Sequence, residues 1–151
     1  MSDQPLWFDD RHTHAAAGVF LLTADRRLIL QLRDDIPGID NPGRITAFAG
    51  GAERHETPIA CALRELNEET GLTAAENALR FVGAVSKIDF RGNPTACMFY
   101  LLTGVDPAAL VVTEGTQVVL TFDQAASDSR LTETARRFAA MIALSLPPPP
   151  G

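Results

Sequence analysis

Apolar and polar positions in the first part of the chain follow the pattern of paired strands. Residues 17–23 are apolar and partly β-branched, a polar ADRR segment follows, and the apolar pattern resumes in LILQLR at 28–33. Two apolar runs separated by a short polar turn predict a β-hairpin. The loop DDIPGIDNPGR comes next, and ITAFAGG then forms a short apolar segment that ends in two glycines.

A helix is predicted in the middle of the chain. Thr57 is a good capping residue, and proline at the first helical position gives up no hydrogen bond that the helix needs. Gly71 provides the stop signal. Between these two ends, apolar side chains recur three and four residues apart and predict a face that packs against the rest of the protein: Ile59, Ala62, Leu63 and Leu66.

Strand patterns dominate the second half of the chain. LRFVGAVSKIDF, TACMFYLLTGV and TQVVLTF each predict a strand, and RLTETARRFAAMIALSL predicts a closing amphipathic helix. Strands outnumber helices and lie on both sides of the central helix, so we expect an α+β fold with a mixed sheet between helices. We expect one domain over residues 1–146 and a flexible proline-rich tail over 147–151, since 151 residues suffice for one core.

The composition narrows the range of partners. A net charge of −6 and a pI near 4.9 argue against binding to long nucleic acid, which depends on clustered basic side chains. We find no membrane span and no basic start followed by an apolar run, so we expect a cytoplasmic protein that binds no membrane. Cys61 and Cys97 are expected to be buried free thiols. An acidic protein that binds a small phosphate compound needs a divalent cation between the two.

Charged side chains gather on one side of the predicted central helix. At about 100° per residue, four of them fall within an arc of about 140°, opposite the apolar face: Arg64, Glu65, Glu68 and Glu69. Like charges at this spacing cost about a few tenths of a kcal/mol for each pair, and the Arg64–Glu68 pair recovers only one such contribution. A hard divalent cation with oxygen ligands would offset this repulsion, and a solvated helix face is the alternative.

The segment from Gly50 to Leu72 follows a spaced pattern. A glycine, five residues, a glutamate and seven residues precede Arg-Glu-aliphatic-any-Glu-Glu-any-Gly-aliphatic. The nine fixed positions are filled without exception: Gly50, Glu56, Arg64, Glu65, Leu66, Glu68, Glu69, Gly71 and Leu72. This segment resembles the signature box of the Nudix hydrolases, and agreement at so many fixed positions makes a chance match very improbable.

The resemblance implies a metal-dependent pyrophosphohydrolase with the α/β/α sandwich of that family. It implies Mg²⁺ or Mn²⁺ held by Glu68 and Glu69, often with Glu65, and by the backbone carbonyl of Ala49. Arg64 is expected to orient this cluster, and catalysis is expected to depend on Arg64, Glu65 and Glu68. Glu65 matches a position that is the general base in some relatives, whereas a glutamate from a later loop has that task in others. Its role therefore stays divided between base and metal ligand.

Four residues are expected near the substrate: Arg33, Gly50, Gly51 and Glu114. Glu114 lies between two predicted strands, where relatives often have an additional ligand or base and where an exposed turn residue is the alternative. Glu56 has either a metal-related role or a favourable interaction with the helix dipole. His55 stands where many relatives have glycine, which leaves a different turn conformation open.

The implied reaction is attack of water on a phosphorus of a nucleoside diphosphate linked to another group. The expected partner is a small nucleotide derivative, and the resemblance also allows a homodimer. The alternative is a catalytically silent module that binds a nucleotide as a sensor. Relatives that hydrolyse ADP-ribose or diadenosine polyphosphates carry a proline or a tyrosine fifteen to eighteen residues beyond the box, where this chain has KIDF. The substrate therefore stays open.

Overall fold

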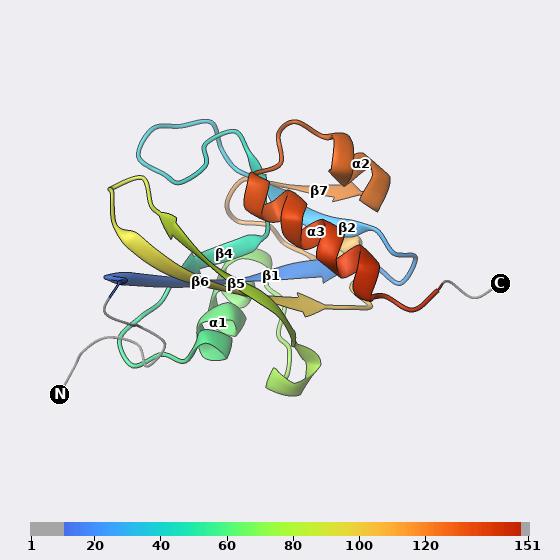
Figure 1. Cartoon of the computed structure of the whole chain (residues 1–151). Helices are drawn as coiled ribbons and strands as arrows, with labels where there is room; N and C mark the ends of the chain where they lie inside the picture. Colours follow the sequence, from blue (N-terminus) through green and yellow to red (C-terminus); the bar gives the residue numbers. More distant parts are fainter. Residues whose placement is uncertain (1–10, 149–151) are drawn as a thin grey trace.

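The computed structural model describes residues 11–148 and contains one mixed sheet with helices on both of its faces (Figure 1). The strands are β1 (His14–Leu22), β2 (Leu28–Leu32), β3 (Ile45–Thr46), β4 (Phe48–Gly51), β5 (Arg80–Ile88), β6 (Pro94–Leu102) and β7 (Thr116–Leu120). The helices are α1 (Pro58–Thr70), α2 (Phe122–Ser127) and α3 (Glu133–Ser145), with 3₁₀ turns η1 (Glu76–Ala78) and η2 (Pro107–Ala109).

Strand β1 organises the sheet. It pairs antiparallel with β2, which confirms the predicted hairpin, and parallel with β6 along most of its length. The β2 pairing uses the end of β1, where Leu21 lies opposite Ile29, whereas the start of β1 pairs antiparallel with β4. The sheet therefore divides beside β1: β2 continues into β3 and β7, and β6 continues into β5.

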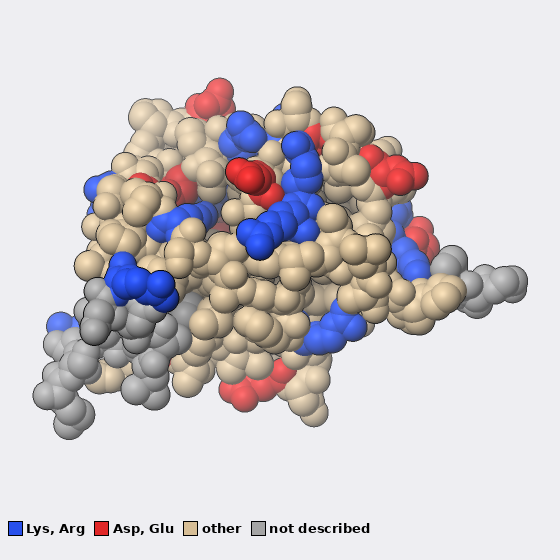
Figure 2. Space-filling model, in the orientation of Figure 1, with Lys and Arg blue, Asp and Glu red and all other residues tan. Residues whose placement is uncertain are grey.

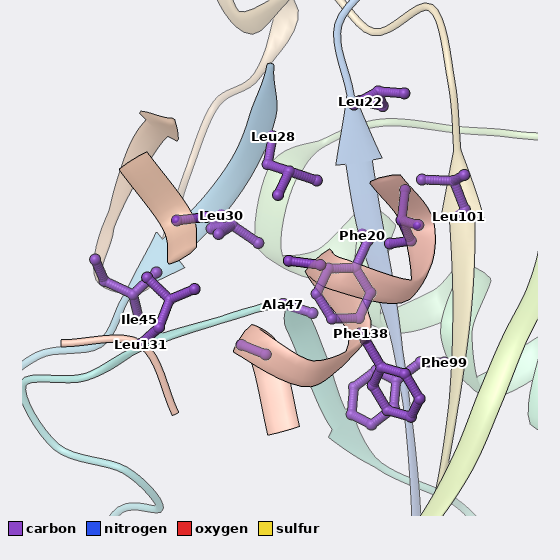
Figure 3. Packing of buried hydrophobic residues seen from close by; sticks show 14 of the residues in the cluster. Phe20, Leu22, Leu28, Leu30, Ile45, Ala47, Phe99, Leu101, Leu131 and Phe138 are labelled. Carbon is purple, nitrogen blue, oxygen red and sulfur yellow. The ribbon is translucent and has the colours of Figure 1, made fainter. Parts of the chain in front are cut away.

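The alternation of side chains along β1 fills a core on each face. Phe20 faces α3 and packs with Phe99 and Phe138, with ring centroids 5.6 and 6.1 Å from its own (Figure 3). Leu21 points to the other face and belongs to the cluster that includes Leu66 of α1. The predicted α+β fold, a mixed sheet between helices, is confirmed.

Helix α1 begins and ends where the sequence predicts. The hydroxyl of Thr57 accepts a hydrogen bond from the Ala60 N–H at 3.2 Å. Gly71 has a positive φ of 76°, and its N–H donates to the Asn67 carbonyl at 2.8 Å. Both ends of the helix are thus fixed by local contacts, which gives its glutamates defined positions.

Helix α2 is a difference from the prediction. The strand expected to continue through Phe122 ends at Leu120, and a helix starts after Thr121. The Thr121 hydroxyl accepts from the Gln124 N–H at 3.1 Å, and the Gln124 side chain accepts from the Thr121 N–H at 2.9 Å. This reciprocal capping pattern is readable in the sequence and would have located the helix start.

The cysteines, the possible membrane spans and the domain bounds can be compared with the structure of the described residues. Cys61 and Cys97 are buried free thiols, as expected. Across residues 11–148, every helix is too short or too polar to cross a membrane. The face in Figure 2 carries acidic and basic side chains side by side. Residues 1–10 of the expected domain and 149–151 of the expected tail lie outside the described residues, so those bounds stay a prediction.

Candidate active site

The guanidinium of Arg64 is the centre of the charged side of α1. It donates two hydrogen bonds to Glu56, at 2.7 and 2.9 Å, so that the two side chains meet fork to fork. It also donates to Glu65 at 2.8 Å, to Glu68 at 3.2 Å and to the Gly51 carbonyl at 2.8 Å. The Arg64 hydrogen bonds hold the pKa of Glu56 below its usual value. Glu56 therefore anchors Arg64, a role that neither sequence interpretation anticipated.

The Glu65 carboxyl group is packed directly against the backbone of β4. A Cβ atom added at Gly50 would lie 2.1 Å from the Glu65 carboxyl carbon and 2.2 and 2.4 Å from its oxygens. Burial raises the pKa of Glu65, and the hydrogen bond from Arg64 acts in the opposite direction. The glycine thus leaves the space in which a half-buried carboxylate is held.

We predict that Gly50→Ala lowers kcat/KM by about 10²-fold, because the new methyl group must displace Glu65 and misplacement of about 1 Å can cost that much. Gly51→Ala is the matched control, since no atom lies within 4 Å of its added Cβ. Steady-state hydrolysis of a nucleotide substrate by both variants checks this. Equal activity of the two variants would contradict a positional requirement for Glu65.

Glu69 is a buried carboxylate. Glu69 is 4% exposed, and its Oε2 atom has no hydrogen-bond partner among residues 11–148. Burial raises the pKa of Glu69 to about 8, with further contributions from the charges of Glu65 and Glu114 and opposing ones from Arg33 and Gln31. A solvated helix face does not account for such a residue.

The raised pKa of Glu69 makes the stability of the metal-free protein depend on pH. The pKa rises from 4.5 to about 8 on folding, so the contribution of Glu69 to stability is highest below pH 4.5 and declines as pH rises towards 8. The slope approaches about 1.4 kcal/mol per pH unit in this window. We predict that Glu69→Gln removes this decline and that Glu68→Gln, at an exposed position, keeps it. Urea unfolding between pH 5 and 8 with a chelator present measures the difference.

The acidic cluster fits a hard cation in its chemistry but is not a preassembled cage. In the described part of the chain, no three carboxylate, thiol or imidazole groups are close enough together to hold a metal ion as they stand. The Glu68 side chain is 55% exposed, and Glu65 and Glu68 both contact Arg64. The donors are oxygen atoms, and the buried Glu69 oxygen lacks a partner. The chemistry of these residues therefore suits Mg²⁺ or Mn²⁺, provided that the exposed Glu68 side chain turns away from Arg64.

A pocket of about 410 Å³ lies on the α3 face of the sheet, beside β4. Phe20, Phe99 and Ala47 contribute its apolar wall, and the first turn of α3 closes one side. The pocket is also lined by Arg33, Ala49, Gly50 and Gly51, which the sequence predicts to be site residues. Gly50 thus borders both the pocket and, through its opposite side, the carboxylate of Glu65.

Arg33 and Glu114 approach the cluster from outside α1. Arg33 lines the pocket, donates to the Asp40 carbonyl at 3.1 Å, and its charge acts on Glu69. The Glu114 side chain is exposed, yet its charge acts on both Glu65 and Glu69. Both residues are therefore near enough for their charges to act on the cluster, whereas their roles stay predictions.

The sequence interpretation missed one residue of the site and left the conformation of one turn open. Gln31 of β2 is 1% exposed and lies beside Glu69, and the only sequence signal for it is a polar residue within an apolar strand pattern. His55 has a φ of 60°, which is the left-handed conformation that glycine favours.

The comparisons with known proteins agree with this geometry. The chain matches the family model for the NUDIX domain over residues 12–141. The MutT protein of Methanosarcina mazei Go1 is similar in structure, with a TM-score of 0.75, 14% identity, and coverage of 91% of this chain and 97% of that one. No curated protein matches the chain in sequence.

Two further similar structures are those of named hydrolases. A C. elegans Ap4A hydrolase and the E. coli dihydroneopterin triphosphate pyrophosphohydrolase both have a TM-score of 0.68 and cover 87% of this chain and 96% of their own. Their identities are 16% and 18%, so these likenesses concern the fold. The family model, in contrast, spans most of the chain. The chain belongs to the Nudix family, and as such it is a hydrolase that acts on phosphate anhydrides.

Proposed function

We propose that this protein hydrolyses a nucleotide derivative at a diphosphate linkage with the help of Mg²⁺ or Mn²⁺. The observation that carries the proposal is the buried carboxylate of Glu69, whose Oε2 atom has no hydrogen-bond partner among the described residues. A buried charge without a partner costs free energy unless another group neutralises it. A divalent cation bound by Glu69 would supply the missing partner.

In this proposal, Glu68 and Glu69 hold the cation together with the Ala49 carbonyl, and Glu65 is either a further ligand or the general base. A divalent cation neutralises phosphate oxygens and makes water easier to deprotonate. Arg64 keeps Glu65 in position against Gly50 through the 2.8 Å hydrogen bond and is itself fixed by Glu56. Proton removal from water by Glu65 is helped by burial, which raises its pKa towards neutrality.

The pocket is suited to the organic part of the substrate. Its volume of about 410 Å³ is in the range of small-molecule sites, and it combines an apolar wall with polar side chains from Lys87, Asp89 and Asp40. Arg33 lines the pocket and acts electrostatically on Glu69, so it lies where phosphates would connect the pocket with the cluster. Two proteins of similar structure are an Ap4A hydrolase and a dihydroneopterin triphosphate pyrophosphohydrolase, each named for a phosphorylated substrate. We propose the same class here.

A panel of nucleotide derivatives tests the proposal. It contains nucleoside triphosphates and their oxidised forms, nucleotide sugars, dinucleoside polyphosphates and pterin triphosphates, each with Mg²⁺, with Mn²⁺ or with a chelator. We expect metal-dependent release of a phosphate product from at least one compound, and loss of that release in Glu69→Gln. Binding of nucleotides without turnover of any of them would instead support the silent sensor module.

A further inference from the structure

The loop that precedes β7 is fastened to the C-terminal end of α1. Three hydrogen bonds join residues 111–115 to the last turn of the helix: Val111 N–H to the Thr70 carbonyl at 2.9 Å, Thr113 N–H to the Glu69 carbonyl at 3.1 Å, and the Thr113 hydroxyl to the Glu68 carbonyl at 3.0 Å. The last carbonyls of a helix have no partner within the helix. This loop supplies partners for three of these carbonyls, those of Glu68, Glu69 and Thr70. Glu68 and Glu69 are the two glutamates expected to hold the cation.

The same loop is fastened to β2 on its other side. The buried Gln31 amide donates to the Glu114 carbonyl at 3.0 Å and accepts from Arg33 at 3.4 Å. Gly115 has a φ of 63°, and an added Cβ would lie 2.3 Å from the Leu32 carbonyl oxygen. The loop therefore lies against β2 too closely for any side chain at that position.

Between these two attachments, the loop presents Glu114 to the carboxylates of α1. The charge of Glu114 acts on Glu65 and on Glu69, so the loop is held in place against electrostatic repulsion. Repulsion of this kind would move an unattached loop away into solvent. The side-chain hydrogen bonds of Gln31 and Thr113 oppose it, together with a longer one of 3.4 Å from the Gly115 N–H to the Asp34 carboxylate.

We propose that Gln31 and Thr113 are positioning residues that hold the 111–115 loop between β2 and α1, so that Glu114 completes the cation site with an additional oxygen ligand. The inference rests on the proposed cation site but not on any particular substrate. It assigns a positioning function to the buried Gln31 amide of β2 and to the Thr113 hydroxyl, both of which lie outside the signature box.

The experiment is a titration with Mn²⁺ alone, followed by the magnetic resonance signal of the free ion. Thr113→Val removes the hydroxyl at an exposed position and is expected to weaken Mn²⁺ binding about 3- to 10-fold, the effect of one hydrogen bond. Thr113→Ser keeps the hydroxyl and is expected to bind like the wild type. Gln31→Met, which keeps the volume without the amide, is expected to weaken binding about 10-fold or more.

A glycine pair tests the placement of the loop without touching these side chains. Gly115→Ala must push the loop away from β2, whereas Gly104→Ala has a similar positive φ of 71° with no atom within 4 Å of the added Cβ. Both variants have the same backbone strain, and thermal unfolding of each measures that cost. We expect only Gly115→Ala to weaken Mn²⁺ binding and, on any nucleotide that is hydrolysed, to lower kcat with KM unchanged.

Wild-type Mn²⁺ affinity in Thr113→Val, together with equal affinity in the two glycine variants, would overturn the inference. Hydrolysis by the wild type combined with that result leaves the proposed function intact and removes only the positioning role. Conversely, weakened Mn²⁺ binding in Thr113→Val and Gly115→Ala supports the positioning role even if none of the nucleotides is turned over. The two proposals can therefore fail separately.

Discussion

Replacement of Glu65 by glutamine is expected to lower kcat/KM by about 10²- to 10⁴-fold, the usual contribution of a positioned acid or base. Glutamine keeps the size of the side chain and can still occupy the space beside Gly50. It removes the negative charge that Arg64 holds at 2.8 Å and the ability to accept a proton from water. The loss should therefore appear in the chemical step and should leave the fold in place.

The same variant separates the two roles that Glu65 has in relatives. If Glu65 is the base, Glu65→Gln lowers kcat and leaves Mn²⁺ affinity unchanged; if it is a ligand, both fall. Glu76→Gln is a suitable control, since Glu76 is an exposed glutamate outside the site. Activity of Glu65→Gln within a few-fold of the wild type would exclude both roles.

The second large effect concerns stability. Arg64→Met is expected to lower the free energy of unfolding by about 2–4 kcal/mol, because it removes the guanidinium that hydrogen-bonds to the carboxylates of Glu56 and Glu65, which have little access to water. Their side chains are 10% and 14% exposed, and that of Arg64 is 22% exposed. The range is set below that of a fully buried pair because some solvent reaches the guanidinium. Urea unfolding near pH 7 measures the change.

Two other variants serve as comparisons for Arg64→Met. Arg27→Met breaks an exposed ion pair with Asp25 and is expected to change stability very little. Arg64→Lys keeps the positive charge but loses the planar fork that joins Glu56 in two hydrogen bonds. We expect it to fall between the wild type and Arg64→Met. A loss in Arg64→Met no larger than in Arg27→Met would contradict the structural role of the network.

Local patterns in the sequence predict the bounds of α1 and the side of this helix on which its charged residues lie. The caps at Thr57 and Gly71 fix the bounds of α1, and the spacing of the signature box places its charged side chains on one arc. Glu69 is buried because it lies at the end of that arc nearest the apolar face. At about 100° per residue, its side chain is only about 20° from that of Ala62 around the helix axis. A list of charged positions does not reveal this, because exposure depends on what packs against the helix.

Contacts between distant parts of the chain account for what the sequence does not predict. Gln31 and Glu114 are 83 positions apart, and Arg64 reaches Glu56 and the Gly51 carbonyl outside its own helix. Such pairings follow from strand order and loop path, which no local pattern specifies. The metal ion, the cytoplasmic location and a homodimer stay predictions.

The position of β4 has a consequence for how such a protein can change. One side of this strand faces the helix that carries the glutamates, and the other borders the pocket beneath α3. If the pocket takes the organic part of the substrate, as we propose, substitutions in its wall alter which molecule is accepted while the carboxylates keep their arrangement. The proposed function thus implies that substrate selection and anhydride cleavage can change separately, since β4, which ends in two glycines, lies between the two regions.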